Sequence, residues 1–269
     1  MLKQRIITAL WLVPLALLGF FVLAGWPFTA FVALVVLLAA WEWAQLAGLR
    51  AQLQRCIFAA VTAAVFLLLA LLPQFWHLAL WLALGWWLAA LVMVFTFPCS
   101  VRSWGGLWGS LLIGWLVLLP AGAGLLQLKT LTQGNALILS IMLLVWTADI
   151  GAYFSGKAFG KRKLAPRVSP GKSWAGLFGG LLASLLVALG CGLYFALPAA
   201  SLSLYLLAAG LIVLFSVVGD LTESMFKRQA GIKDSSNLLP GHGGVMDRID
   251  SLTAAVPLYA LYLLQAGWA

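Results

Sequence analysis

Acidic residues are scarce in this chain, and most of them lie in one stretch. Only 9% of the 269 residues are charged, yet five of the seven Asp and Glu residues lie in 219–250, interleaved with four basic residues. The acids are Asp220, Glu223, Asp234, Asp247 and Asp250, and the bases are Lys227, Arg228, Lys233 and Arg248. Carboxylates that hold a divalent cation, beside cations that bind phosphate, suit metal-assisted phosphoryl or nucleotidyl transfer.

The first carboxylate pair lies near the end of an apolar run. Asp220 and Glu223 are three residues apart and Ser224 follows Asp220 by four, so a helix places all three on one face. Carboxylates in apolar surroundings are costly unless they are paired or face a polar cavity. The simpler alternative for Asp220 is an ion pair with Lys227 or Arg228.

Asp247 and Asp250 repeat this spacing at the start of the next apolar run. Acidic residues at a helix N-terminus can simply cap the helix and favour its dipole. Together with Asp220, however, they could converge on one divalent cation. Mg²⁺ is typically held by a few carboxylates together with water and substrate phosphates.

Two segments of small residues precede apolar runs and are candidates for phosphate binding. The first is Pro240-Gly-His-Gly-Gly244, in which Gly243 and Gly244 let backbone N–H groups approach an anion. His242 could act there as a general base, as a hydrogen-bond donor to a phosphate or as a metal ligand. The second is Ser169-Pro-Gly-Lys-Ser173, in which Lys172 is the strongest phosphate-binding candidate.

Three further polar features have competing interpretations. Asp149, with Tyr153 one turn later, ends an apolar run and could bind substrate or pair with a loop cation. Glu42 lies between two tryptophans, and a buried interhelical partner is its default interpretation. Basic residues in 161–167 are explained by membrane topology, and Asp234 and Lys233 could simply be solvated.

The elements that must position these residues are membrane helices. The chain is 64% hydrophobic, whereas soluble domains are about 45–50% apolar. Nine apolar runs are long enough to cross a bilayer at roughly 20 residues each. They fall at about 6–25, 28–47, 57–73, 78–97, 106–126, 136–153, 174–197, 203–226 and 251–267. We therefore expect an all-α polytopic membrane protein of about nine transmembrane helices and one integral membrane domain, 1–269. Its first five helices (about 1–130) form a scaffold, and helices six to nine with two cytoplasmic loops (about 136–269) carry the catalytic residues.

Charge asymmetry predicts the orientation. With the N-terminus in the cytoplasm, 15 of the 16 Lys and Arg residues lie on the cytoplasmic side, and Lys129 alone lies on the other. The C-terminus is then on the opposite side. The net charge of +9 has this topological explanation, so no nucleic-acid partner is predicted.

The stretch from Ser224 to Asp250 closely resembles the signature of the phosphatidate cytidylyltransferases, also called CDP-diacylglycerol synthases. The likeness rests on Lys227-Arg228, Lys233-Asp234, His242-Gly-Gly and Asp247-Arg-Ile-Asp250. Asp149-x-Gly-Ala-Tyr153 and Ser169-Pro-x-Lys-Ser173 also look like this family. The chain departs from the family pattern at Gly171, where Lys is common, and at Ala175, where Glu is common.

The resemblance implies that CTP and phosphatidate give CDP-diacylglycerol and pyrophosphate, with Mg²⁺ as cofactor and a second, monovalent cation such as K⁺. It implies a multi-pass protein of the inner membrane with its site facing the cytoplasm, and a tendency to form homodimers. The implied metal ligands are Asp220, Asp247 and Asp250. The implied catalytic residues are Asp220, Asp247, Lys227, Arg228 and His242. Substrate binding falls to Asp149, Tyr153, Ser169, Lys172, Ser173, Ser224, Gly243, Gly244 and Arg248.

Two other functions compete with this one. A related lipid nucleotidyltransferase, or a lipid kinase with an isoprenoid or alcohol acceptor, would use the same kind of site. An ion-coupled transporter would explain the intramembrane acids Asp220, Glu223 and Glu42. The long polar signature and the lack of a convincing internal repeat weigh against the transporter.

Overall fold

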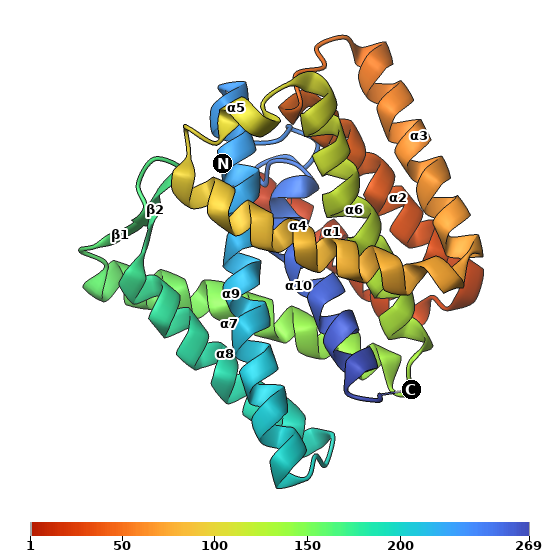
Figure 1. Ribbon diagram of the computed structural model, residues 1–269, viewed down its shortest axis with the longest axis vertical. Helices are drawn as coiled ribbons and strands as arrows, with labels where there is room; N and C mark the ends of the chain where they lie inside the picture. The colour runs from red at the N-terminus through yellow and green to blue at the C-terminus, as the bar shows by residue number, and fades with distance from the viewer. Residues whose placement is uncertain (1, 269) are drawn as a thin grey trace.

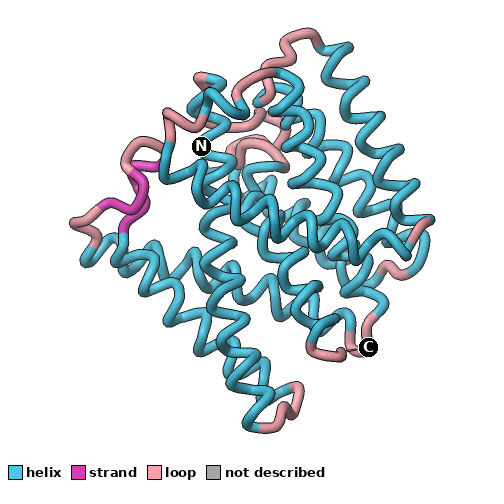
Figure 2. Tube along the Cα trace, viewed as in Figure 1, coloured by secondary structure: helices cyan, strands magenta, loops and turns pink. Residues whose placement is uncertain are grey.

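The computed structural model describes residues 2–268, with side chains for residue 8 and for 10–268, and it is dominated by helices (Figures 1 and 2). The side chains of Lys3 and Arg5, which entered the charge count above, lie outside the described part. Each of the nine apolar runs corresponds to a long helix. These are α1 (Leu2–Leu17, continued by the π-helical turn η1, Leu18–Val22), α2 (Gly25–Leu46), α3 (Gln52–Leu71), α4 (Trp76–Thr96), α6 (Leu107–Thr130), α7 (Gly134–Phe159), α8 (Trp174–Tyr194), α9 (Ala199–Ala230) and α10 (Met246–Gln265). The short helices η2 (Pro73–Phe75) and α5 (Val101–Trp104) lie in connections.

Seven of these helices, in the part of the chain that the structure describes, are long and apolar enough to cross a membrane. They are α2, α3, α4 with η2, α6, α7, α8 and α9. The expectation of an all-α polytopic membrane protein is confirmed at this level. The other two predicted spans differ from these seven. The apolar stretch of the first, Leu10–Val22, is shorter, and α10 begins with polar turns, so the count of nine crossings remains a prediction.

A short β-hairpin interrupts the helical pattern. Strand β1 (Lys163–Ala165) pairs antiparallel with β2 (Ser169–Ser173), which runs directly into α8. Pro166 and Pro170 lie in this segment, and proline is poorly tolerated inside a helix because it lacks a backbone N–H. The hairpin therefore replaces the simple loop that the hydrophobic pattern suggested, and it carries Lys172 toward the helices.

The connections fall at two ends of the bundle. The α2–α3 turn, α5 and the hairpin lie along the upper and left rim, and the loop before α10 lies inside the upper part of the molecule. The α6–α7 and α8–α9 turns and the C-terminus lie at the lower end (Figure 1). Thr8 Oγ1 donates to the Pro240 carbonyl oxygen at 2.8 Å, which places α1 beside the loop that precedes α10. Lys129 Nζ donates to the Phe20 carbonyl oxygen at 2.7 Å, which places η1 beside the α6–α7 turn. This arrangement is the one that alternating crossings require.

Glycines allow the helices around the site to approach closely. A Cβ atom at Gly219 on α9 would lie 2.6 Å from the Asp250 carbonyl oxygen on α10. A Cβ atom at Gly180 on α8 would lie 2.5 Å from the Ala148 carbonyl oxygen on α7. Small residues at such positions let membrane helices pack backbone against backbone. The two contacts fix α7 to α8 and α9 to α10, and these four helices carry most of the predicted site residues.

Candidate active site

Asp220 and Asp250 lie on the closely packed faces of α9 and α10. Because Gly219 meets the Asp250 backbone, the residue that follows Gly219 is next to the second turn of α10. The charges of Asp220 and Asp250 interact with each other and with that of Lys172. The structure thus brings together two of the three carboxylates that the sequence assigned to a cation.

Asp220 has an ion-pair partner from the hairpin. Lys172 Nζ lies 2.8 Å from Asp220 Oδ2, and both side chains are about a quarter exposed, at 25% and 27%. Ser224 Oγ donates to Asp220 Oδ1 at 3.3 Å, as the four-residue spacing suggested. The simple alternative of an ion pair holds for Asp220, but its partner is Lys172 rather than Lys227 or Arg228.

Lys227 joins the two helices at a second point. Its Nζ lies 2.5 Å from Glu223 Oε2 and 2.7 Å from Asp247 Oδ1. Glu223 is 1% exposed, and its other oxygen, Oε1, is buried and receives no hydrogen bond from the described residues. Four carboxyl groups, counting Asp250, and two ammonium groups are therefore gathered where α9 and α10 meet.

The glycine loop before α10 wraps around Asp247. Asp247 Oδ2 accepts hydrogen bonds from Ser235 N at 3.0 Å, Ser235 Oγ at 2.9 Å and Gly244 N at 2.7 Å. Gly243 has a φ of +82°, and a Cβ atom there would lie 2.6 Å from Asp247 Oδ2. The loop does surround an anion, but in this structure the anion is a side chain of the protein itself. Substrate binding by Gly243 and Gly244 remains a prediction.

Glu42 completes this loop from a distant helix. It lies on α2, is fully buried, and accepts hydrogen bonds from the loop and from the N-terminus of α10. The expected buried interhelical partner is Met246 N at the start of α10, and the other donors belong to the loop that precedes this helix. Ser235, which contacts both Glu42 and Asp247, was missed. The available signal was its position within the recognised signature.

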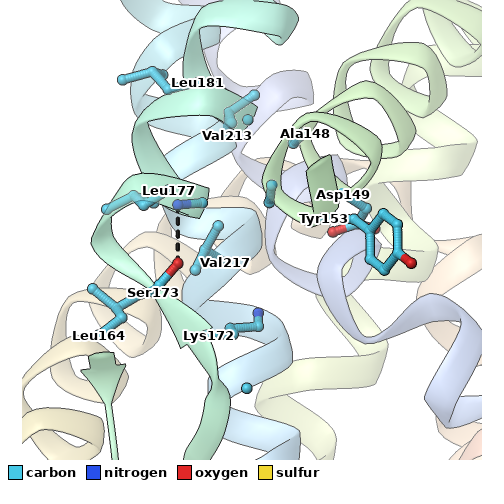
Figure 3. Close-up of a pocket in the computed structure, with 14 residues that line it drawn as sticks. Ala148, Asp149, Tyr153, Leu164, Lys172, Ser173, Leu177, Leu181, Val213 and Val217 are labelled. Carbon is cyan, nitrogen blue, oxygen red and sulfur yellow. Dashed lines mark hydrogen bonds between the residues drawn. The ribbon is translucent and has the colours of Figure 1, made fainter. Parts of the chain in front are cut away.

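A cavity of about 200 Å³ lies beside the ion pair, between α7, α8 and α9 (Figure 3). Asp149 and Tyr153 line it from α7, and Lys172 lines it from the end of β2. Its remaining wall is largely apolar and includes Leu164, Leu177, Leu181, Val213 and Val217. One end can therefore bind charged groups while the wall accommodates hydrocarbon.

Two serines in the hairpin have different environments. Ser173 is buried, and its Oγ accepts a hydrogen bond from Gly176 N at 3.1 Å, so it caps the N-terminus of α8. This local role accounts for a hydroxyl at that position and leaves substrate binding untested. Ser169 begins β2 and is partly exposed. Tyr153 is 62% exposed, with Lys157 Nζ 6.0 Å from its ring centroid.

The remaining predicted residues hold the polar segments in place. Arg248 donates through Nε and Nη2 to the His242 carbonyl oxygen at 3.0 and 2.6 Å. Arg228 Nε donates to the Val168 carbonyl oxygen at 3.1 Å and so ties α9 to the hairpin. His242 Nδ1 is buried and has no hydrogen-bond partner among the described residues. Asp234 and Lys233 are exposed, as expected.

The donor chemistry of the site fits Mg²⁺. Among residues 2–268, no group of three or more His, Cys, Asp and Glu side chains is arranged to hold a metal ion. Mg²⁺ is commonly bound by only one or two carboxylates, with substrate phosphates and water supplying the rest. The buried, unpartnered Glu223 Oε1 indicates that the acidic cluster has room for further positive charge.

Comparison with known proteins identifies the family of the chain. A family model described as "Cytidylyltransferase family" matches residues 3–265, so the chain belongs to the cytidylyltransferase family. The phosphatidate cytidylyltransferase of Pseudomonas aeruginosa is 61% identical over 268 residues, which cover 100% of this chain and 99% of that protein. The phosphatidate cytidylyltransferase of Haemophilus influenzae is 41% identical over 285 residues, covering 97% of this chain and 98% of that protein. The family resemblance read from the signature is confirmed.

Proposed function

We propose that this membrane enzyme transfers a cytidylyl group from CTP to phosphatidate, giving CDP-diacylglycerol and pyrophosphate. The observation that carries the proposal is the 61% identity along the full length to a phosphatidate cytidylyltransferase. The cavity supports it, because Lys172 and Asp149 lie at one end and an apolar wall continues from them. A phosphate ester of a lipid has the same two-part character.

The reaction is an in-line displacement at the α-phosphorus of CTP. A phosphate oxygen of phosphatidate forms the new P–O bond, and the bond to the β-phosphate breaks to release pyrophosphate. Because a phosphate nucleophile is already anionic near neutral pH, the step needs no strong base. His242 then serves as a hydrogen-bond donor to a phosphate. Catalysis then consists mainly of positioning and charge neutralisation.

Lys172 and Lys227 supply that positive charge. Each lies within 2.8 Å of a carboxylate, and each can exchange this partner for a phosphate oxygen. Ser224, held against Asp220, and Arg228, at the same end of α9, lie where a phosphate chain would enter. Asp149 and Tyr153 then contact substrate from α7.

Of Asp220, Asp247 and Asp250, one or two carboxylates would hold Mg²⁺, which is the number that this ion commonly takes from a protein. Bound there, Mg²⁺ would supply positive charge that offsets the negative charge of the substrate phosphates. The three carboxylates come from the C-terminal part of α9 and the N-terminal part of α10. With the predicted orientation, this site lies at the cytoplasmic surface of the inner membrane. CTP can reach it from water and phosphatidate from the bilayer.

The proposal predicts that the purified protein in detergent releases pyrophosphate from CTP only when phosphatidate and Mg²⁺ are both present. Omitting phosphatidate, omitting Mg²⁺ or replacing CTP by another nucleoside triphosphate provides the controls. A screen of isoprenoid and other alcohol acceptors with labelled CTP separates related transferases. Well-folded wild-type protein that releases no pyrophosphate with CTP, phosphatidate and Mg²⁺ would contradict the proposed function.

A further inference from the structure

Glu42 is a buried carboxylate whose partners all come from one short segment. It lies on α2 and is 0% exposed. Its Oε1 accepts from Ser236 Oγ at 2.6 Å and from Val245 N at 2.9 Å. Its Oε2 accepts from Ser235 Oγ at 3.1 Å and from Met246 N at 2.6 Å. The four donors belong to the loop before α10 and to the first residue of that helix.

These hydrogen bonds leave Glu42 no capacity for substrate or metal. A carboxylate offers about four lone-pair positions, and four donors lie within hydrogen-bond distance of them, one of which, Ser235 Oγ, is shared with Asp247. A charged group buried this completely is costly unless it is hydrogen-bonded, so its contacts must be maintained. Glu42 is therefore suited to hold other residues in place rather than to contact the reacting atoms.

The contacts of Glu42 lead directly to Asp247. Ser235 Oγ lies 3.1 Å from Glu42 Oε2 and 2.9 Å from Asp247 Oδ2, and its single hydrogen can serve only one of them at a time. Gly244 N donates to Asp247 Oδ2, while a Cβ atom at Gly244 would collide with the Glu42 carboxylate and with Ser235 Oγ. The two carboxylates thus contact the same loop and compete for the Ser235 hydroxyl.

We propose that Glu42 is a positioning residue for Asp247. By occupying the N–H groups of Val245 and Met246 and sharing Ser235, it prevents Asp247 from turning back to cap α10. Asp247 Oδ1 is thereby kept toward Lys227 and the cation site, 2.7 Å from Lys227 Nζ. The inference rests on the proposed role of Asp247 in that site.

Glu42→Gln tests the idea with little change in volume. Each Glu42 oxygen accepts one backbone N–H, so the amide nitrogen of glutamine must face either Val245 N or Met246 N. Hydroxyls can rotate away from such a clash, but a helix N–H cannot. We expect kcat to fall and the Mg²⁺ concentration for half-maximal turnover to rise by about 10–100-fold, the usual effect of losing a residue that orients a metal ligand. The KM for phosphatidate should stay near that of the wild type.

A second readout is independent of turnover. Hydrogen–deuterium exchange of the metal-free protein should accelerate in 235–246 in Glu42→Gln. Thr29→Val is the matched control, because Thr29 is also buried on α2 and donates to the carbonyl oxygen of Gly25 within its own helix. This control should leave the exchange of 235–246 and the Mg²⁺ dependence unchanged.

The proposal is overturned if Glu42→Gln loses thermal stability but keeps the kcat, the Mg²⁺ dependence and the hydrogen–deuterium exchange of 235–246 of the wild type. If that variant does not fold, Ser235→Ala tests the same link, and wild-type Mg²⁺ dependence in it would overturn the proposal equally. When both variants fold, their effects should be less than additive because they act through one network. Asp247→Asn with full turnover, or wild-type protein inactive with CTP and phosphatidate, would instead reject the proposed site or function.

Discussion

Lys172 and Lys227 are the two ammonium groups that touch the acidic cluster of α9 and α10. Lys172 lies 2.8 Å from Asp220, and Lys227 lies between Glu223 and Asp247. Paired in this way, the lysines limit repulsion among the carboxylates. A nucleotide that arrives with several negative charges can recruit the same lysines. The pairing is therefore compatible with both a structural and a catalytic role, and a matched pair of variants distinguishes them.

Lys172→Gln should reduce kcat about 100-fold or more, the loss typical when one donor to a developing negative charge is removed. Lys163→Gln is the matched control, because Lys163 is exposed and pairs in register with Ser173 on the same hairpin. It should turn over close to the wild-type rate. Pyrophosphate release at saturating CTP and phosphatidate measures both. Equal activity of the two variants would show that Lys172 only supports topology.

The candidate acids could be selected from the sequence because carboxylates are rare in this chain. Asp220, Asp247 and Asp250 are three of only seven acids, and the spacing of Asp247 and Asp250 is that of one helical face. The partners were not predictable, because they depend on tertiary contacts. Glu42 and Ser235 are 193 positions apart, and no local pattern links an acid in one apolar run to a serine in a distant loop.

At the scale of elements, α7 and α8 form the frame of the cavity. Gly180 meets the backbone at Ala148, and Gly151 meets the backbone at Gly179, so the two helices touch along one face. This contact sets the separation between Asp149 on α7 and Lys172, which immediately precedes the α8 cap. The hydrophobic pattern predicted α8 and the start of α7 closely, but it ended α7 at 153, whereas the helix continues to Phe159. It could not predict the β-hairpin, whose two short strands have no periodic signal.

Gly180→Ala should separate these helices. The new Cβ atom would lie 2.5 Å from the Ala148 carbonyl oxygen, and overpacking of this kind costs about 1–3 kcal/mol of unfolding free energy. Turnover should fall as well, because the cavity widens between Asp149 and Lys172. Gly190→Ala on the same helix is the control, since a Cβ atom there meets nothing within 4 Å. Thermal unfolding in detergent and pyrophosphate release are the measurements, and equal behaviour of the two variants would contradict the close contact.

At the scale of the whole molecule, most basic residues and the candidate site residues lie toward the same end of the helix bundle. The loop before α10, the hairpin and α5 lie at the end that also holds the start of α1, as the Thr8–Pro240 contact requires. Lys129, the one basic residue predicted on the opposite side, donates to the Phe20 carbonyl oxygen and to Asn135 Oδ1 at 2.6 Å. The sequence predicted this division from charge counts alone, because positive residues mark the cytoplasmic side irrespective of packing.

The division predicts which loops are reachable from each side of the membrane. Three helices, α7, α8 and α9, separate Thr132 from Lys233, so the two residues should lie on opposite sides. Both are exposed, and each can be replaced by cysteine in a chain whose Cys56, Cys99 and Cys191 are serine. A membrane-impermeant maleimide should label Lys233→Cys only in inside-out vesicles and Thr132→Cys only in right-side-out vesicles. Labelling of both from one side would mean that an even number of the three helices cross. If Lys233→Cys were labelled in right-side-out vesicles, the acidic site beside it would no longer face the compartment that supplies CTP.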